Sequence, residues 1–258
     1  MLRVITCNLN GIRAAARKGF FRWMPAHAPD VVCLQETKAQ EHQLPPEALA
    51  LEAYPYAGFA DARKKGYSGV GILSRRKPVD VARGIGVEEM DDEGRFLRMR
   101  FESGLSICSL YVPSGTMGPA RQEVKERFLD YFIAVLARMK NEGTPTIVCG
   151  DYNIAHREID VFSPRACATT TGFLPQERAW FDQVVERVGW IDAFREVNKE
   201  HKQFTWWSGW KGAWEKNLGW RIDYQLVTPE LAPRVRAANI YRAERFSDHA
   251  PLTIDYDL

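Results

Sequence analysis

Apolar residues gather in short runs that recur along the whole chain and are rich in valine, isoleucine and leucine. Their length predicts buried β-strands, because amphipathic helices need longer stretches with a different period. The turn residues Glu102, Ser103 and Gly104 indicate that two of these strands form an antiparallel hairpin. The predicted strands lie near residues 2–8, 31–35, 70–74, 79–82, 95–102, 105–112, 145–150, 221–228, 234–241 and 250–257.

Three other segments carry apolar residues at steps of three and four, the spacing of a helix with one buried face. They cover residues 13–24, 119–142 and 175–188. Pro25 interrupts the first, whereas the other two begin with proline and stop at glycine. Helices separate some strands but not others, so the pattern favours a layered α/β sandwich of two sheets over a purely parallel, doubly wound sheet.

With 258 residues, 45% of them hydrophobic, the chain is large enough to bury a sizeable core. No linker, repeat or low-complexity tract divides it, so we expect residues 1–258 to form a single catalytic domain. The N-terminus lacks the layout of a signal peptide, and no apolar stretch approaches the length that spans a bilayer. The five cysteines are odd in number and lack metal-type spacing, which fits buried thiols in a reducing compartment. These features predict a cytoplasmic monomer without a membrane partner.

The formal net charge of +2 says little about the substrate by itself. Basic residues nevertheless cluster, and Arg13, Arg17, Lys18 and Arg22 form one such group. A cluster of this kind is either a solvated surface or a footprint for a phosphate backbone, and charge alone does not decide between them.

Six polar residues stand directly beside the predicted strands, where strand ends would hold them rigidly: Asn8, Glu36, Asp151, Asn153, Asp248 and His249. We expect them to form one catalytic rim, although they are scattered over nearly the whole chain. Carboxylates and carboxamides with one imidazole, without repeated His or Cys spacing, favour Mg²⁺ or Mn²⁺ over zinc. A phosphate ester is therefore the predicted substrate.

Seven short motifs resemble, in order and separation, those of the exonuclease III family of abasic-site endonucleases. They are LQETK (34–38), YSGVG (67–71), YVP (111–113), GDYN (150–153), GFLPQER (172–178), GWRIDY (219–224) and SDH (247–249). The resemblance covers essentially the full length and implies a DNase I-like fold, a four-layered sandwich of two mixed β-sheets flanked by helices. It also implies Mg²⁺-dependent cleavage of double-stranded DNA 5′ to an abasic site to leave a 3′-hydroxyl. Activity on 3′ ends, as a 3′–5′ exonuclease or 3′-phosphodiesterase, is compatible with it.

The resemblance supports Glu36 as the principal metal ligand, with Asn10 nearby. Many relatives carry aspartate in place of Asn10, and the neutral amide lowers the charge of the ligand set. Asp248 would contribute to the metal or to orientation, and Lys38 would position Glu36. Asp151, which we expect a turn at Gly150 to place, would accept the proton of the attacking water.

Five further residues would complete the hydrolytic machinery. Asn153 would orient the attacking water, and Asn8 would hold neighbouring side chains. An isolated histidine is more often structural, but in the resemblance Asp223 orients His249, which would donate to the phosphoryl oxygen that gains charge. Tyr111 would donate its hydroxyl to the scissile phosphate.

Five of the eight tryptophans fall between residues 206 and 220, a higher density than core packing requires. The resemblance matches Trp206, Trp220 and Ile222 to the wall of a pocket that admits a deoxyribose without its base. It matches Trp210 to a residue that is inserted into the duplex.

Three basic residues complete the expected set of DNA contacts: Arg13, Lys38 and Arg221. Residues 162–171 depart from the family, because many relatives carry an Asn- and Lys-rich loop there and this chain has FSPRACATTT. That loop normally contacts phosphates, so its replacement bears on DNA affinity and on the balance of activities.

Two alternatives stay open. The catabolite repression control protein, a non-enzymatic RNA-binding regulator, has similar tryptophan-rich segments but lacks a complete catalytic set. A phosphatase of the same superfamily would need a pocket for a charged headgroup, whereas the tryptophan cluster favours a DNA lesion. The complete set of polar residues favours an enzyme.

Overall fold

The computed structural model describes residues 1–49 and 51–258, and in this part the strands form two six-stranded sheets and a two-stranded ribbon. The first sheet, in the order β13-β14-β1-β2-β4-β3, consists of β1 (Leu2–Asn8), β2 (Val31–Gln35), β3 (Tyr56–Ala60), β4 (Val70–Ser74), β13 (Val235–Ile240) and β14 (Leu252–Tyr256). The second, in the order β5-β6-β7-β8-β12-β9, consists of β5 (Pro78–Arg83), β6 (Phe96–Phe101), β7 (Ser106–Tyr111), β8 (Thr146–Asp151), β9 (Ile191–Asp192) and β12 (Asp223–Val227). Both sheets contain parallel and antiparallel pairs, as predicted. The ribbon pairs β10 (Trp206–Trp207) with β11 (Gly219–Trp220).

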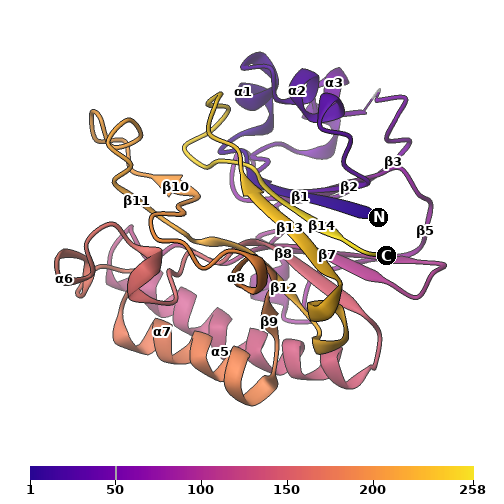
Figure 1. The fold of residues 1–258 in the computed structure, drawn as a ribbon. Helices are drawn as coiled ribbons and strands as arrows, with labels where there is room; N and C mark the ends of the chain where they lie inside the picture. The colour runs from indigo at the N-terminus through magenta and orange to yellow at the C-terminus, as the bar shows by residue number, and fades with distance from the viewer. Residues whose placement is uncertain (50) are drawn as a thin grey trace.

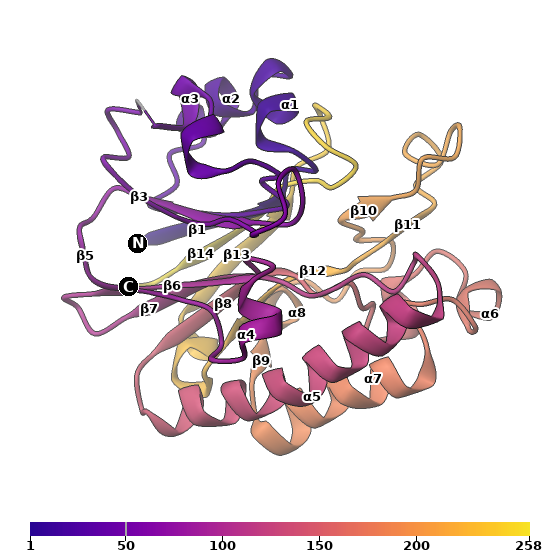
Figure 2. The same cartoon turned by 180° about the vertical axis from the view of Figure 1, so that it is seen from behind.

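The longer helices lie on the two outer faces of the paired sheets (Figure 1). The first sheet is covered by α1 (Ile12–Arg17), α2 (Phe20–Ala26) and α3 (Pro46–Leu49), and the second by α5 (Pro119–Asn141) and α7 (Pro175–Asp182). Figure 2 shows α5 and α7 side by side beneath the second sheet. A π-helical stretch, Gln183–Val188, continues α7, and the remaining segments are α4 (Glu88–Asp91), α6 (Pro164–Cys167), α8 (Ala193–Val197) and the 3₁₀ turns Glu41–Gln43, Glu158–Asp160 and Pro229–Arg234. Among the described residues, no helix combines the length and apolarity needed to cross a bilayer.

Three apolar layers hold these elements together. Phe20 and Leu34 belong to the layer between the first helices and the first sheet, and Ile72 and Ile147 to the layer between the sheets. The third layer, with Phe132, joins the second sheet to α5 and α7. The order helix, sheet, sheet, helix is the predicted four-layered sandwich.

The strands and helices differ from the sequence-based expectation at a few points. β3 was not predicted, because its sequence Tyr-Ala-Gly-Phe-Ala contains no aliphatic side chain larger than alanine. The first expected helix is split by Gly19, whose φ of 93° is left-handed. α2 then continues through Pro25 to Ala26, so the proline lies inside its last turn.

Candidate active site

Strand pairing within the two sheets brings polar residues at strand ends to one edge of the sandwich. In the first sheet, Asn8 at the end of β1 lies opposite Gln35 at the end of β2, directly before Glu36. In the second sheet, Asp151 at the end of β8 lies opposite Tyr111 and Asp223 on its two neighbours. Side chains from both sheets therefore face one another at this edge.

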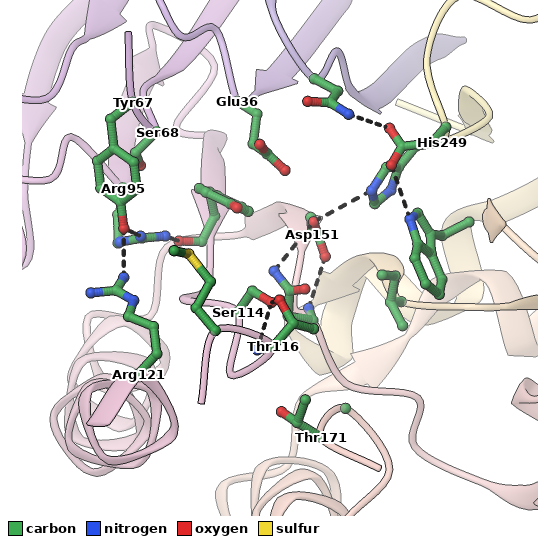
Figure 3. A pocket seen from close by; sticks show the side chains of 18 of the residues that line it. Glu36, Tyr67, Ser68, Arg95, Ser114, Thr116, Arg121, Asp151, Thr171 and His249 are labelled. Carbon is green, nitrogen blue, oxygen red and sulfur yellow. Dashed lines mark hydrogen bonds and ion pairs between the residues drawn. The ribbon is translucent and has the colours of Figure 1, made fainter. Parts of the chain in front are cut away.

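Glu36, Asp151 and His249 form the centre of the site. Each offers one possible ligand atom, and these atoms lie within 4.8 Å of one another. Figure 3 shows all three turned toward the same cavity. The amide of Asn8 donates to Glu36 Oε1 (2.7 Å) and to Asp151 Oδ2 (2.8 Å), so a single side chain ties the two sheets together at the site.

His249 is held between two carboxylates. Its Nδ1 lies 2.8 Å from Asp223 Oδ2, and its Nε2 lies 3.8 Å from Asp151 Oδ2. Burial by itself would lower the pKa of His249, but the charges of Asp223 and Asp151 outweigh it and raise that pKa to about 10. The imidazole is therefore a cation at neutral pH and a hydrogen-bond donor toward the cavity.

Asp151 lies in a buried, negatively charged environment. Burial, together with the charges of Asp223 and Glu36, raises its pKa to about 7 against the opposing charge of His249. The backbone N–H of Asn153 donates to Asp151 Oδ1 at 2.8 Å. Gly150 does not form the expected turn but belongs to β8, where a Cβ would lie 1.9 Å from the carbonyl oxygen of Leu110.

Asp248 lies beside this centre and is joined to Glu36 through Lys38 and Asn10. Lys38 Nζ contacts Glu36 Oε2 (2.6 Å) and Asn10 Oδ1 (2.5 Å), and Asn10 Nδ2 donates to Asp248 Oδ1 (2.9 Å). The other carboxylate oxygen of Asp248 accepts from Trp206 Nε1 at 3.2 Å. Asn10 thus connects Lys38 with Asp248.

Tyr111 is buried beside Glu36. Burial raises the pKa of the Tyr111 hydroxyl well above its usual range, and the charge of Glu36 adds to the effect. The phenol therefore keeps its proton and serves as a donor.

The backbone of the site is locally strained. Non-glycine residues with positive φ include Asn10 (45°), Glu36 (47°), Lys38 (48°), Ser68 (48°) and Asn153 (51°), and all five line the same cavity. Such conformations persist only where surrounding contacts enforce them, and they are typical of functional sites.

The cavity has a volume of about 510 Å³, and Trp206, Trp220 and Ile222 form part of its wall. Trp210 lies outside it, 78% exposed, in the hairpin between β10 and β11 that projects from the body of the protein (Figure 1). Arg13 lines a neighbouring basic depression together with Arg17, Lys38 and other residues.

Arg221 is not on the surface where it was expected. It is 1% exposed, and its guanidinium contacts Asp160 Oδ1 (2.8 Å) and Asp192 Oδ2 (2.7 Å). The sequence signal was its position between two pocket residues, but Arg221 lies between β11 and β12, where its side chain pairs with Asp160 and Asp192 in the interior. The assignment of Arg221 to DNA contact was therefore wrong.

The sequence reasoning missed a basic cluster on the far wall of the cavity. The Tyr67 hydroxyl accepts from Arg95 Nη2 (2.9 Å) and Arg121 Nη2 (2.7 Å), and Glu93 is the carboxylate that both arginines share. Figure 3 shows Tyr67, Arg95 and Arg121 together on this side. The YSGVG motif around Tyr67 was the available signal, whereas nothing in the sequence connected it with the arginines.

The atypical loop contributes two threonines to the lining of the cavity. Thr170 and Thr171 line it, and α6 occupies the earlier part of residues 162–171. Thr171 Oγ1 donates to Gln122 Oε1 at 2.7 Å, which ties the loop to α5.

Comparison with known proteins places this site in context. Residues 5–249 match the family described as the Endonuclease/Exonuclease/phosphatase family. The chain is 36% identical to an exodeoxyribonuclease of Bacillus subtilis, covering 98% of both proteins. It is 35% identical to the DNA repair nuclease APEX1 of Danio rerio, covering 98% of this chain and 81% of the relative.

Solved structures agree with these sequence relatives. An AP endonuclease from Archaeoglobus fulgidus has a TM-score of 0.90 with 30% identity, and a 3′–5′ exonuclease from Neisseria meningitidis has a TM-score of 0.90 with 27% identity. Each comparison covers the whole of both chains.

Proposed function

The chain belongs to the endonuclease/exonuclease/phosphatase family and is a DNA repair nuclease, and we propose that it cleaves the phosphodiester bond 5′ to an abasic site to leave a 3′-hydroxyl. One observation carries the proposal. The centre formed by Glu36, Asp151 and His249 shares a single cavity with an apolar wall that includes Trp206 and Trp220. A sugar without its base fits such a wall, whereas a phosphomonoester headgroup would gain nothing from it.

The side chains supply the functions that phosphodiester hydrolysis needs. Asp151, with its pKa near neutrality, takes the proton of the attacking water, and Asn153 orients that water. Protonated His249 donates to the phosphoryl oxygen that gains charge, with Asp223 holding its ring in place. Tyr111 adds a second donor.

The donor atoms fit a hard divalent cation, and we propose Mg²⁺, with Mn²⁺ as a substitute. Glu36 offers a carboxylate oxygen as the principal ligand, and Asn10 and Asp248 line the same cavity with further oxygen atoms, which is the chemistry such ions prefer. We assign His249 the role of donor rather than ligand, because its Nδ1 is already paired with Asp223 Oδ2 at 2.8 Å. A bound ion would neutralise charge on the phosphoryl oxygens and lower the pKa of water.

We propose one catalytic domain over residues 1–258, acting as a cytoplasmic monomer on double-stranded DNA with abasic sites or 3′ ends. The site draws on both sheets, which supports a single domain, and all five cysteines are buried thiols, which supports a reducing compartment. The complete hydrolytic set speaks against a non-enzymatic RNA-binding regulator.

The proposed activity is tested on a duplex with one tetrahydrofuran abasic analogue. We expect a nick 5′ to the analogue with Mg²⁺ and none with EDTA, and restored cleavage when Mg²⁺ or Mn²⁺ is added back. A matched duplex with a 3′-phosphate measures end processing in parallel. Absence of an EDTA-sensitive nick at the analogue would refute the proposal.

Replacing Trp206 by alanine is expected to weaken the preference for abasic over intact DNA by about tenfold or more, because a pocket wall is lost. The ratio of kcat/KM on the two duplexes measures this preference. Trp206→Phe is the matched control, because it keeps a smaller aromatic wall while it removes the Nε1 bond to Asp248. An unchanged preference in Trp206→Ala would argue against this assignment.

The alkaline limb of the pH–rate profile is expected to depend on Asp223. The proton of His249 is needed, so activity is present below its folded-state pKa of about 10 and is lost as the pH rises through it. In Asp223→Asn the largest charge that raises this pKa is gone, so the limb moves toward neutral pH. Profiles of kcat for both proteins test this, and coincident alkaline limbs would contradict the role of His249.

A further inference from the structure

A buried ion pair lies beside the backbone of Asn153 and has no part in the hydrolysis described above. Lys125 of α5 and Glu177 of α7 have side chains that are 1% and 0% exposed, and Lys125 Nζ lies 2.5 Å from Glu177 Oε1. Glu177 belongs to the GFLPQER motif, which so far has no role. A buried pair is an expensive way to join two helices, because desolvation offsets most of its attraction. Its other contacts indicate what it does.

Lys125 contacts the backbone of Asn153. Its ammonium donates to the carbonyl oxygen of Asn153 at 2.8 Å. Asn153 has a φ of 51°, a conformation that costs free energy in any residue with a side chain. The carboxamide of Asn153 donates to the carbonyl of Val112 at 2.9 Å, so the residue is anchored at both ends.

Glu177 holds the loop that forms part of the cavity wall. Its Oε2 accepts from the backbone N–H groups of Gly172 (2.6 Å) and Leu174 (3.0 Å). Thr171 and Gly172 line the cavity, and the carbonyl of Gly172 accepts from the N–H of Ala155 at 2.7 Å. The loop is thereby tied back to the segment that follows Asn153.

We propose that Lys125 and Glu177 are a positioning pair for Asn153. Together they hold the carboxamide that orients the attacking water and the cavity wall at residues 170–172 in one fixed arrangement. Neither residue lines the cavity, so both would act through Asn153 and the loop. The inference rests on the proposed function, because it assigns the pair to the same hydrolysis.

Glu177→Gln keeps the size of the side chain, but one amide cannot accept from both Lys125 and the loop N–H groups. We expect kcat on the abasic duplex to fall by about 10- to 100-fold, with KM little changed, because small misplacements in a reacting site have effects of this size. Asp255→Asn is the matched control. It breaks the Arg3–Asp255 pair near the opposite end of β1 and should leave kcat unchanged.

A double-mutant cycle separates positioning from general stability. Asn153→Gly removes the carboxamide but tolerates the positive φ. If the pair acts through Asn153, Glu177→Gln should lower kcat in the wild-type background and have little effect in the Asn153→Gly background. Equal losses in both backgrounds, or a lower melting temperature with unchanged kcat, would overturn the proposal.

Glu177→Gln leaves the charge of Lys125 buried and unpaired, so the variant is at risk of unfolding. The double variant Lys125→Met/Glu177→Gln removes both charges, and neutral replacements of this kind are often tolerated. Its loss of kcat should again be small in the Asn153→Gly background. An equal loss of kcat in both backgrounds in this folded variant would also overturn the proposal. Failure of the proposed function is distinguishable from failure of this inference. A wild type that acts only on the 3′-phosphate duplex would refute the abasic preference, and the double-mutant cycle would then be measured on the 3′-phosphate duplex.

Discussion

Asp151→Asn is expected to reduce turnover of the abasic duplex by about 10²- to 10⁴-fold, the usual contribution of a general base. The substitution removes the group that accepts the proton of water but leaves the shape of the cavity. DNA binding should be nearly unchanged, because the contacts expected at the basic depression and the exposed hairpin are intact. Single-turnover cleavage and binding in EDTA measure the two quantities separately.

Asp151→Asn is expected to cost one hydrogen bond within the site. Asp151 Oδ1 accepts from the N–H of Asn153 and Oδ2 from the amide of Asn8, and an asparagine can accept at only one of the two positions. The loss of repulsion from Glu36 and Asp223 works in the opposite direction. Near-normal turnover in Asp151→Asn would rule out its role as the base, whereas loss of binding would point to a disturbed fold.

Asp160→Asn is expected to lower the free energy of unfolding by about 3 kcal/mol or more, the usual cost of breaking a buried ion pair. Asp160 is 1% exposed and contacts the buried Arg221 at 2.8 Å and Arg195 at 2.6 Å. Without its charge, Arg221 keeps only Asp192 as a partner, and its desolvation is no longer compensated. Denaturant unfolding at neutral pH measures the difference.

The stability of the fold at acid pH gives an independent check on the role of Asp160. Burial alone would raise its pKa, but the charges of Arg221 and Arg195 lower it to about 2. Its contribution to stability is therefore complete above the unfolded-state pKa and is lost as the pH falls toward 2. The difference between wild type and Asp160→Asn should shrink over this range. Asp92→Asn, which breaks an exposed pair with Arg63, should cost under about 1 kcal/mol, and an equal effect of the two variants would contradict the buried role.

The sequence predicted the scaffold well because strand and helix patterns are local. Ten short apolar runs mark ten strands, and the periodic segment 119–142 marks α5. β3 escaped because its residues are small or aromatic, and it pairs only at the edge of its sheet. Gly19 changed the first helix, since one left-handed residue redirects the chain without altering the apolar pattern on either side.

The candidate site was predictable as a list of residues but not as a network. Asn8, Glu36 and Asp151 could be selected because they follow strands, yet their mutual hydrogen bonds depend on how the two sheets pack. The contacts of Tyr67 with Arg95 and Arg121 join three separate segments, and no spacing in the sequence indicates them.

The sequence by itself determined the layered sheets, the strand-end carboxylates and the tryptophan-rich segment, because these depend on residue type and local period. Only the tertiary structure decided that Arg221 is buried, that Asp248 pairs with Asn10, and that Lys125 and Glu177 meet behind Asn153. Charge pairing and burial are set by residues that are distant along the chain and adjacent in space. Their energies depend on geometry and on the exclusion of water, which the order of residues does not specify.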